Sequence, residues 1–397
     1  MLFRSVYHPF DVKLSKYREA HYVLYLLRQT GAAQWVELGE ARIIDNAVQA
    51  LRKALRNPQT LGTLRIARAL DELLLRPLRP LLSDAKHLLI SPDGALNLIP
   101  FVALVDEQNK YLLERFTITY LTSGRDLLRL QVPHESHSEA VIVADPEFGA
   151  PLLVYDKKQA RLDESSVFFE SLPGAKSELR GLRELLPESS VLSREQATET
   201  ALKRVRAPRI LHIATHGFFM QAEEREAVPV APSRKRKAAT VGPSTRLAKL
   251  ALNIADPMLR SGLALAGVNQ GKSDKDDGVL TALEMVGLDL WGTKLVALSA
   301  CDTGVGEVRN GEGVYGLRRA LVLAGAESQL MSLWPVADRG TRDLMIGYYK
   351  ALLQGQARGE SLRQVQLQML RSREHQHPFY WASFIQSGEW ANLEGKR

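Results

Sequence analysis

The sequence predicts an α/β protein built on a mainly parallel β-sheet that is covered by helices. Two observations carry this prediction. Short apolar runs of strand length alternate with longer segments whose apolar residues recur at helical spacing, a pattern typical of parallel strands joined by crossover helices. Apolar residues make up 45% of the 397 residues and charged residues 24%, which is ordinary for a globular chain and excludes a disordered one. The length suggests two domains or three.

The first α/β region covers about residues 20–132. Its clearest helix is 40–56, where Ile44, Val48 and Leu51 recur on one face. Pro92 and Gly94 end one of its strands in a turn, and β-branched and aromatic residues mark another strand. In chain order, the predicted elements are a strand at 22–27, helices at 40–56 and 61–82, and strands at 87–94 and 116–121.

A polar linker at 131–138 leads to a second α/β series. Thr198 is placed to cap a helix, and Thr281 with Glu284 forms a capping box that opens another. Predicted strands lie at 139–146, 190–193, 209–217, 293–301 and 328–336. Predicted helices lie at 175–186, 198–206, 281–284, 313–324, 342–353 and 361–371. The linker therefore divides the chain into one half at 1–133 and a second half at 138–397.

The alternating pattern breaks down between Phe219 and Pro257. This stretch contains acidic residues, two prolines and the basic run Arg-Lys-Arg-Lys at 234–237. Such a composition predicts a long, flexible, basic loop at 220–256. The basic run is consistent with a solvated loop tip, with a site for an anionic partner, or with a processing site.

Charge and cysteine content exclude several classes of protein. The net charge of +7 is mild for this length, so we expect no nucleic-acid partner. The most apolar stretches are too short to cross a bilayer and the N-terminus lacks a signal-peptide core, so we expect a cytoplasmic protein that does not contact a membrane. The single cysteine, Cys301, excludes an intrachain disulfide framework and a thiolate zinc site. We expect no metal and no cofactor.

His216 and Cys301 each stand at the carboxyl end of a predicted buried strand. In open parallel sheets, ligands bind outside that edge. A thiol beside an imidazole there supplies a nucleophile and a base, because the thiolate is the reactive form and a nearby His favours it. The backbone N–H groups of Gly217 and Cys301 are candidate donors to a developing oxyanion. Taken alone, these residues leave alternatives open: a strand Cys is often a small buried hydrophobe, and a strand His is often structural, as we expect for His212.

Several motifs, in consistent order, resemble the CHAT peptidases, a caspase-related family of cysteine proteases of clan CD. The motifs are Ile90-Ser-Pro-Asp-Gly, Val143-Ala-Asp-Pro, Leu172-Pro-Gly-Ala, Leu211-His-Ile-Ala-Thr-His216-Gly-Phe-Phe, Leu298-Ser-Ala-Cys301-Asp-Thr-Gly, Gly311-Glu-Gly-Val-Tyr-Gly-Leu-Arg-Arg-Ala, Ser332-Leu-Trp-Pro-Val-Ala-Asp and His377-Pro-Phe-Tyr-Trp-Ala-Ser-Phe. The resemblance covers about residues 20–390. It implies a caspase-like sheet, a His/Cys dyad at His216 and Cys301, and a degenerate pseudo-caspase-like N-terminal half without a dyad of its own.

The resemblance also implies where a substrate binds. By analogy with related clan members, the strand at 328–336 lines the substrate groove. Ser332 then pairs with substrate backbone, and Trp334 forms a pocket wall, although an ordinary core position for Trp334 stays open. Asp145 either faces the cleft or caps the turn beside Pro146.

One position departs from relatives that cut after Arg or Lys. Those relatives carry an Asp two residues before the nucleophile, and this chain has Ser299 there. The position therefore does not support basic specificity. Asp338 and Asp302 remain candidates for an acidic pocket.

The function implied is that of a cysteine endopeptidase that cleaves a protein substrate, as a regulated step in bacterial signalling or defence. Cys301 would attack the scissile carbonyl, and His216 would handle the proton transfers. Many relatives carry a tetratricopeptide-repeat array before the peptidase; this chain has none, so we expect a separate activating or recruiting protein. The alternative is a catalytically silent caspase-like scaffold that binds a partner protein.

Overall fold

The computed structural model describes most of the chain. The described residues are 2–11, 16–17, 19–150, 155–156, 161–162, 168–219, 256–270, 276–300, 307–309, 313–335 and 338–396. The predicted basic loop at 220–256 lies outside them except for its last residue, and so do Cys301 and Asp302.

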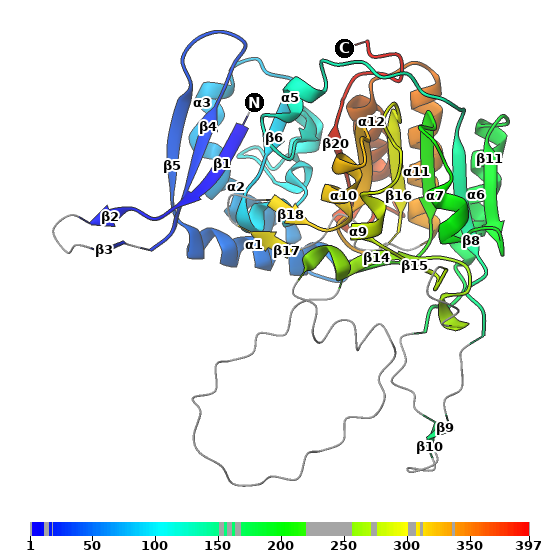
Figure 1. Ribbon diagram of the computed structural model, residues 1–397. Helices are drawn as coiled ribbons and strands as arrows, with labels where there is room; N and C mark the ends of the chain where they lie inside the picture. The colour runs from blue at the N-terminus through cyan, green and yellow to red at the C-terminus, as the bar shows by residue number, and fades with distance from the viewer. Residues whose placement is uncertain are drawn as a thin grey trace.

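Eleven strands of the described chain form one sheet (Figure 1). Their order is β11-β8-β12-β16-β19-β20-β7-β6-β1-β4-β5. The first half contributes β1 (Leu2–Tyr7), β4 (His21–Leu26), β5 (Gln34–Glu40), β6 (His87–Ser91) and β7 (Thr117–Tyr120). The second half contributes β8 (Val141–Pro146), β11 (Ser190–Arg194), β12 (Ile210–Ala214), β16 (Leu295–Ser299), β19 (Ser328–Ser332) and β20 (Phe384–Gly388). The two halves of the sequence therefore occupy opposite ends of one sheet.

Most neighbouring strands are parallel, which confirms the predicted fold class. Of the ten neighbouring pairs among these strands, seven are parallel. The pairs β1·β4, β4·β5 and β19·β20 are antiparallel. The two halves meet at β20, which is antiparallel to β19 and pairs in parallel with β7 through Ser387 and Tyr120. The last strand of the chain thus lies in the middle of the sheet.

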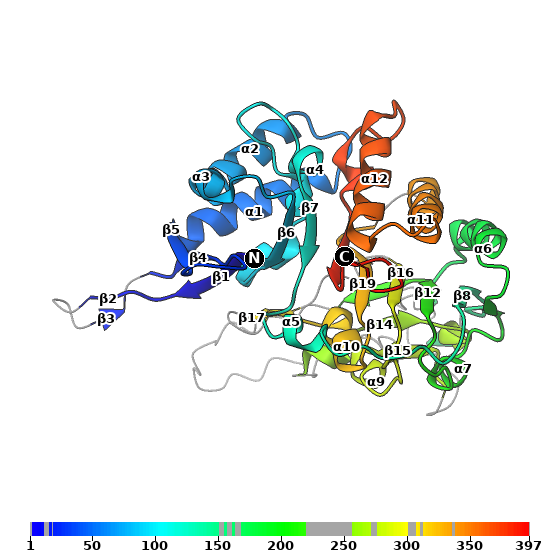
Figure 2. The same cartoon turned by 90° about the horizontal axis from the view of Figure 1, so that it is seen from above.

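Helices cover the sheet in layers (Figure 2). One face carries α1 (Ala41–Leu55), α2 (Thr63–Leu74), α3 (Arg79–Leu82), α6 (Pro173–Leu185), α11 (Asp338–Leu353) and α12 (Arg358–Arg371). The other face of the second half carries α7 (Glu199–Lys203), α9 (Ala282–Met285) and α10 (Leu317–Leu323). Shorter helices are α4 (Leu112–Arg115), α5 (Asp126–Arg129) and α13 (Pro378–Trp381).

Two apolar cores lie on the two faces of the sheet. The larger core is continuous through both halves, from Val48 on α1 to Tyr349 on α11. The smaller core lies under α7, α9 and α10 and includes Leu211 of β12 and Val296 of β16. Because successive strand side chains point to opposite faces, β12 and β16 contribute to both cores and are buried throughout.

Local sequence signals explain where several helices begin and end. The predicted caps are confirmed: the hydroxyl of Thr198 accepts a hydrogen bond from the backbone N–H of Ala201, and Thr281 with Glu284 forms a capping box. The stretch 61–82 is not one helix, because Pro77 and Pro80 each lack an N–H and begin a new segment, η1 (Arg76–Leu78) and then α3. The stretch 313–324 is also not wholly helical, since it opens as the short strand β18 (Gly313–Tyr315) before α10.

Small antiparallel sheets lie outside the main sheet. β13 (Gly217–Phe219) follows β12 and joins β14 (Ser261–Ala264) and β15 (Val279–Thr281) in a three-stranded sheet. β17 (Glu307–Arg309) pairs with β18. The pairs β2 (Phe10–Asp11) with β3 (Lys16–Tyr17), and β9 (Tyr155–Asp156) with β10 (Arg161–Leu162), stand apart from the main sheet.

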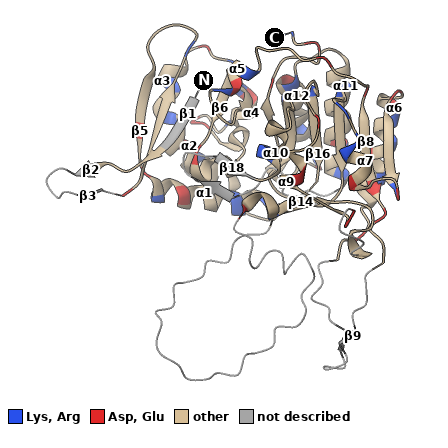
Figure 3. Ribbon diagram, in the orientation of Figure 1, with Lys and Arg blue, Asp and Glu red and all other residues tan. Residues whose placement is uncertain are grey.

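Charged residues are distributed over both halves (Figure 3). Within the described ranges, no helix combines the length and the hydropathy required to cross a membrane.

Candidate active site

The two strands that lead to His216 and Cys301 are neighbours in the sheet. β12 and β16 pair in parallel, with Ala214 opposite Ser299, the last residue of each strand. In the sequence, His216 follows Ala214 by two residues and Cys301 follows Ser299 by two residues. The sheet therefore aligns the two strand ends that precede the predicted dyad, and Cys301 itself lies beyond the described residues.

His216 stands just past the end of β12, with its imidazole between two aromatic rings. The ring centroids of Phe148 and Phe169 lie 5.3 and 5.4 Å from that of the imidazole. Nε2 of His216 is 2.8 Å from the carbonyl oxygen of Glu170. Because a carbonyl oxygen only accepts, this contact assigns the proton to Nε2 and leaves a lone pair on Nδ1 of the neutral ring. The backbone carbonyl of His216 accepts a hydrogen bond from the N–H of Ala264, which fixes the main chain as well.

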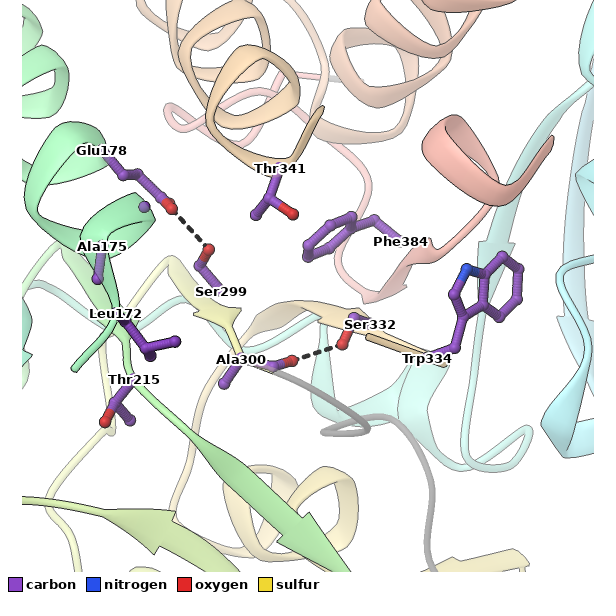
Figure 4. Close-up of a pocket in the computed structure, with 11 residues that line it drawn as sticks. Leu172, Ala175, Glu178, Thr215, Ser299, Ala300, Ser332, Trp334, Thr341 and Phe384 are labelled. Atoms are coloured by element: carbon purple, nitrogen blue, oxygen red, sulfur yellow. Dashed lines mark hydrogen bonds between the residues drawn. The ribbon is translucent and has the colours of Figure 1, made fainter. Parts of the chain in front are cut away.

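A pocket lies beside the end of β16 (Figure 4). Its walls come from α6 and the residue before it and from the ends of β12, β16 and β19. The start of β20 and the segment that follows β19 also contribute to these walls. They include Leu172, Ala175, Glu178, Thr215, Ser299, Ala300, Ser332, Trp334 and Phe384. Two of the lining residues are sequence neighbours of the predicted dyad: Thr215 directly precedes His216, and Ala300 directly precedes Cys301.

Ser332 and Trp334 both line this pocket and are both held by the protein itself. The hydroxyl of Ser332 donates to the carbonyl oxygen of Ala300 at 2.5 Å, and its backbone lies opposite Phe384 in the β19–β20 pair. The indole N–H of Trp334 donates to the carbonyl oxygen of Phe379 at 3.0 Å, and the side chain belongs to the larger core. Trp334 is therefore a core residue and a pocket wall at once. Pairing of Ser332 with substrate backbone stays a prediction.

A chain of buried polar groups leads away from the pocket. The hydroxyl of Ser299 donates to Oε2 of Glu178 at 2.8 Å, and Oε1 of Glu178 lies 2.9 Å from Nε2 of His212. Nδ1 of His212 in turn lies 3.1 Å from the hydroxyl of Tyr349. Burial, together with the neighbouring Tyr348 and Glu178, raises the pKa of Tyr349 well above its ordinary value, so its hydroxyl stays protonated. The structural role expected of His212 is confirmed.

The other predicted positions are spread around the strand ends. The carboxylate of Asp145 lies at the end of β8, where Nη1 of Arg194 approaches it at 3.9 Å, and Asp145 does not line the pocket. Gly217 opens β13 and lies opposite Leu263 of β14. Asp338 is the first residue of α11. Substrate contact by Asp145, Asp338 or Asp302 and oxyanion binding by Gly217 stay predictions. Within the described ranges, no group of three or more His, Cys, Asp or Glu side chains is placed to hold a metal ion.

The structure adds four functional candidates that the sequence patterns do not identify. Phe148 and Phe169 flank the imidazole of His216, and Glu170 contacts it through a backbone carbonyl. Glu178 brings a carboxylate into the pocket wall. The only sequence signal for the aromatic residues is that each stands beside a recognisable motif, Phe148 after Val143-Ala-Asp-Pro and Phe169 before Leu172-Pro-Gly-Ala.

Comparison with known proteins gives relatives of very different size. The chain is 27% identical over 352 residues to human tetratricopeptide repeat protein 28 and 26% identical over 357 residues to the mouse protein of that name. Each match covers 82% of this chain, and the chain spans only 13% of the length of these curated relatives.

Two solved structures align with most of this chain at low sequence identity. Gingipain R, described as an Arg-specific cysteine proteinase, matches with a TM-score of 0.44 and 10% identity over 88% of this chain and 74% of its own. The Saccharomyces cerevisiae separase–securin complex matches with a TM-score of 0.43 and 12% identity over 92% of this chain and 21% of that one.

The family is shown by a match along most of the sequence. The CHAT domain model matches residues 64–389, a range that starts in α2 and ends directly after β20. This range contains the strand ends, the pocket and both positions of the predicted dyad. The resemblance seen in the motifs is thereby confirmed, and the chain belongs to the CHAT domain family.

Proposed function

We propose that this chain is a cysteine endopeptidase that hydrolyses peptide bonds of a protein substrate through Cys301 and His216. The observation that carries the proposal is the register of β12 and β16. Ala214 lies opposite Ser299, and two more residues lead from these positions to His216 and Cys301. Two parallel strands in register deliver the residues that come after them to the same edge of a sheet, which is where such sheets bind ligands.

The hydrogen bond from His216 to Glu170 supports the role of the imidazole. With the proton on Nε2 held by the carbonyl oxygen, Nδ1 is the atom that is free to accept a proton. The flanking rings of Phe148 and Phe169 restrict rotation of the imidazole about its side-chain bonds. A base whose tautomer and orientation are fixed before the substrate arrives needs no reorganisation during the reaction.

The reaction is built from these groups. Nδ1 of His216 takes the proton of the Cys301 thiol, and the thiolate sulfur bonds to the carbonyl carbon of the substrate. The tetrahedral intermediate collapses as the C–N bond breaks, and the imidazolium gives its proton to the leaving amine. A water molecule, deprotonated by His216, attacks the thioester, and the new carboxylic acid leaves as the thiol is restored. In both tetrahedral intermediates the backbone N–H groups of Gly217 and Cys301 stabilise the oxyanion.

Regulation by a partner protein forms the last part of the proposal. The curated relatives are named for tetratricopeptide repeats, and this chain spans 13% of their length. We propose that an activating or recruiting protein brings substrate to this chain, as a regulated step in bacterial signalling or defence.

The test is proteolysis of a pool of candidate protein substrates, starting with proteins encoded beside this one. The wild-type chain runs next to a Cys301→Ala variant, and mass spectrometry identifies new N-termini. We expect cleavage by the wild type and a loss of at least about 1000-fold in the variant. Cuts that persist in Cys301→Ala would contradict the proposal. Labelling of Cys301 by a thiol-reactive probe without any cut would indicate a nucleophile that still requires its partner, and absence of both would favour a non-catalytic scaffold.

A further inference from the structure

The pocket beside β16 contains a buried carboxylate for which the proposed chemistry has no use. Glu178 is 3% exposed and lines the pocket from α6. Figure 4 shows its carboxylate directed at the hydroxyl of Ser299, at one end of the pocket. Among the described residues, His212 is the one basic side chain that contacts Glu178 in an ion-pair geometry. No Lys or Arg of the described chain pairs with it.

One carboxylate oxygen of Glu178, Oε1, is buried and makes no hydrogen bond within the described chain. Nε2 of His212 lies 2.9 Å from this oxygen but outside hydrogen-bond geometry. The ring of His212 is held from its other side, where Nδ1 lies 3.1 Å from the hydroxyl of Tyr349. The pocket wall therefore contains a buried carboxylate oxygen that no donor of the described chain satisfies.

A buried carboxylate without a cation costs several kcal/mol in lost hydration. A positively charged group that enters the pocket recovers part of that cost. The remaining walls fit the rest of such a group, because Leu172, Ala175, Trp334 and Phe384 present apolar surface. Lys and Arg bury their aliphatic stems along apolar surface and direct their charged heads to a polar partner.

We propose that this pocket binds the cationic side chain of a substrate Arg or Lys, with Glu178 as its counter-ion and Ser299 holding the carboxylate in place. The inference rests on the proposed function, because the residue bound is taken to be the one that precedes the cleaved bond. The position two residues before Cys301 carries no acid of its own. The hydroxyl of Ser299, which occupies that position, is nevertheless hydrogen-bonded to the carboxylate of Glu178. The acidic group of the pocket is therefore supplied from α6.

The first experiment measures cleavage of four fluorogenic peptides that differ only in the residue before the scissile bond: Arg, Lys, norleucine or Glu. The wild-type chain is compared with Glu178→Gln, which keeps the shape and can still accept from Ser299 but removes the charge. We expect wild type to favour Arg and Lys over norleucine by about 30-fold or more, and Glu178→Gln to lose most of that preference. Glu178→Asp keeps the charge, so it should retain a preference for the basic peptides.

Two controls make the result specific. Glu184→Gln removes an exposed carboxylate from the same helix and should leave the preference unchanged. Thermal unfolding shows whether each variant folds. If Glu178→Gln does not fold, the pocket is tested by the binding of the two amides to Cys301→Ala, described next.

The second experiment does not depend on catalysis. Binding of N-acetyl-arginine methylamide and N-acetyl-norleucine methylamide to the Cys301→Ala protein is followed by NMR, with and without the Glu178→Gln change. Tighter binding of the arginine compound that is lost with Glu178→Gln supports the pocket even if no peptide is cleaved, which would count against the proposed function alone. Cleavage with a preference for norleucine or Glu, or equal binding of the two amides, overturns the pocket assignment and leaves the peptidase proposal standing.

Discussion

The two halves of the sheet differ in the chain segments that come directly after their parallel strands. After β6, the chain enters the short helices η2 (Gly94–Leu98) and η3 (Phe101–Ala103), and Leu96 and Phe101 are fully buried there. The polar groups of this stretch are used internally. Asp93 accepts from the N–H of Gly94 at 2.8 Å, and the amide of Asn97 donates to two carbonyl oxygens at 3.2 Å. The end of β6 is therefore covered by buried apolar side chains and internal hydrogen bonds; we call the first half the sealed half for this reason.

After β16, by contrast, the chain borders a pocket. Ser299 contributes a hydroxyl and Glu178 a carboxylate to its wall. The same α/β arrangement therefore ends its strands in two ways: packed apolar residues follow β6, and a pocket with polar atoms in its wall lies beside the end of β16. We expect substitutions in the core of the first half to change stability. Substitutions at the strand ends of the second half should change activity.

The largest expected effect is on activity, from His216→Gln. Without the imidazole, neither thiolate formation nor protonation of the leaving amine is assisted, so the rate of peptide cleavage should fall by about 1000-fold or more. The free energy of unfolding should change by less than about 1 kcal/mol, because the side chain is half-buried at the end of a strand. Initial rates and urea unfolding curves of the same preparations check both parts.

A matched control for this variant is His137→Gln in the exposed linker, which should change neither quantity. Peptide cleavage retained in His216→Gln would contradict the proposed role of His216 as the base and acid of the reaction.

The next largest effect is on stability, from Phe101→Ala in the sealed half. Truncation of a fully buried phenyl ring leaves a cavity, and the free energy of unfolding should fall by about 3–5 kcal/mol. Leu61→Ala, at a 95% exposed position in the same half, should change it by less than about 0.5 kcal/mol. Urea unfolding gives both values. Cleavage per folded molecule should stay within about twofold of wild type. A large loss of cleavage in a Phe101→Ala protein that still folds would contradict the distinction between the two halves.

The smallest expected effect depends on pH and concerns His87 at the start of β6. Burial lowers the pKa of His87 to about 4, against the opposing influence of Glu360. Between that value and the ordinary pKa of about 6.5, the unfolded chain binds a proton that the folded chain does not. The free energy of unfolding should therefore decrease by about 2–3 kcal/mol as the pH falls from 7 to 4. His87→Gln should show a correspondingly weaker decrease.

Asp71 acts in the opposite direction. Burial raises its pKa to about 6, so its contribution favours the folded state at lower pH over part of the same range. Asp71 is present in both wild type and His87→Gln. Its contribution therefore cancels when the free energy of unfolding of one protein is subtracted from that of the other at each pH. Parallel pH curves for the two proteins would contradict the assignment to His87.

The fold was largely predictable where strands are continuous apolar runs. β12 and β16 have such runs, and both lie close to their predicted positions. The pattern does not predict β1, β5 or β20. In β20, Gln386 and Ser387 resemble surface residues, yet both are buried. The side-chain oxygen of Gln386 accepts a hydrogen bond from Thr119 at 2.8 Å, and a partner so distant in the sequence leaves no local signal.

The site was predictable in part, for a similar reason. His216 and Cys301 could be named because each follows an apolar strand within a recognisable motif. Glu178 could not, because one carboxylate within the polar run Lys176-Ser-Glu resembles any charged residue on an exposed helix face. Glu170 contributes a backbone carbonyl, which any residue at that position would supply, so no side-chain pattern identifies it.

The central position of β20 has a consequence for synthesis of the protein on the ribosome. β7 ends at Tyr120, and its partner β20 begins only at Phe384. At about 5–20 residues per second, one edge of β7 waits on the order of ten seconds to a minute for its neighbour. During that interval the newly made first half exposes unpaired backbone groups that can pair with other chains. The nascent protein is therefore expected to depend on chaperones until β20 emerges.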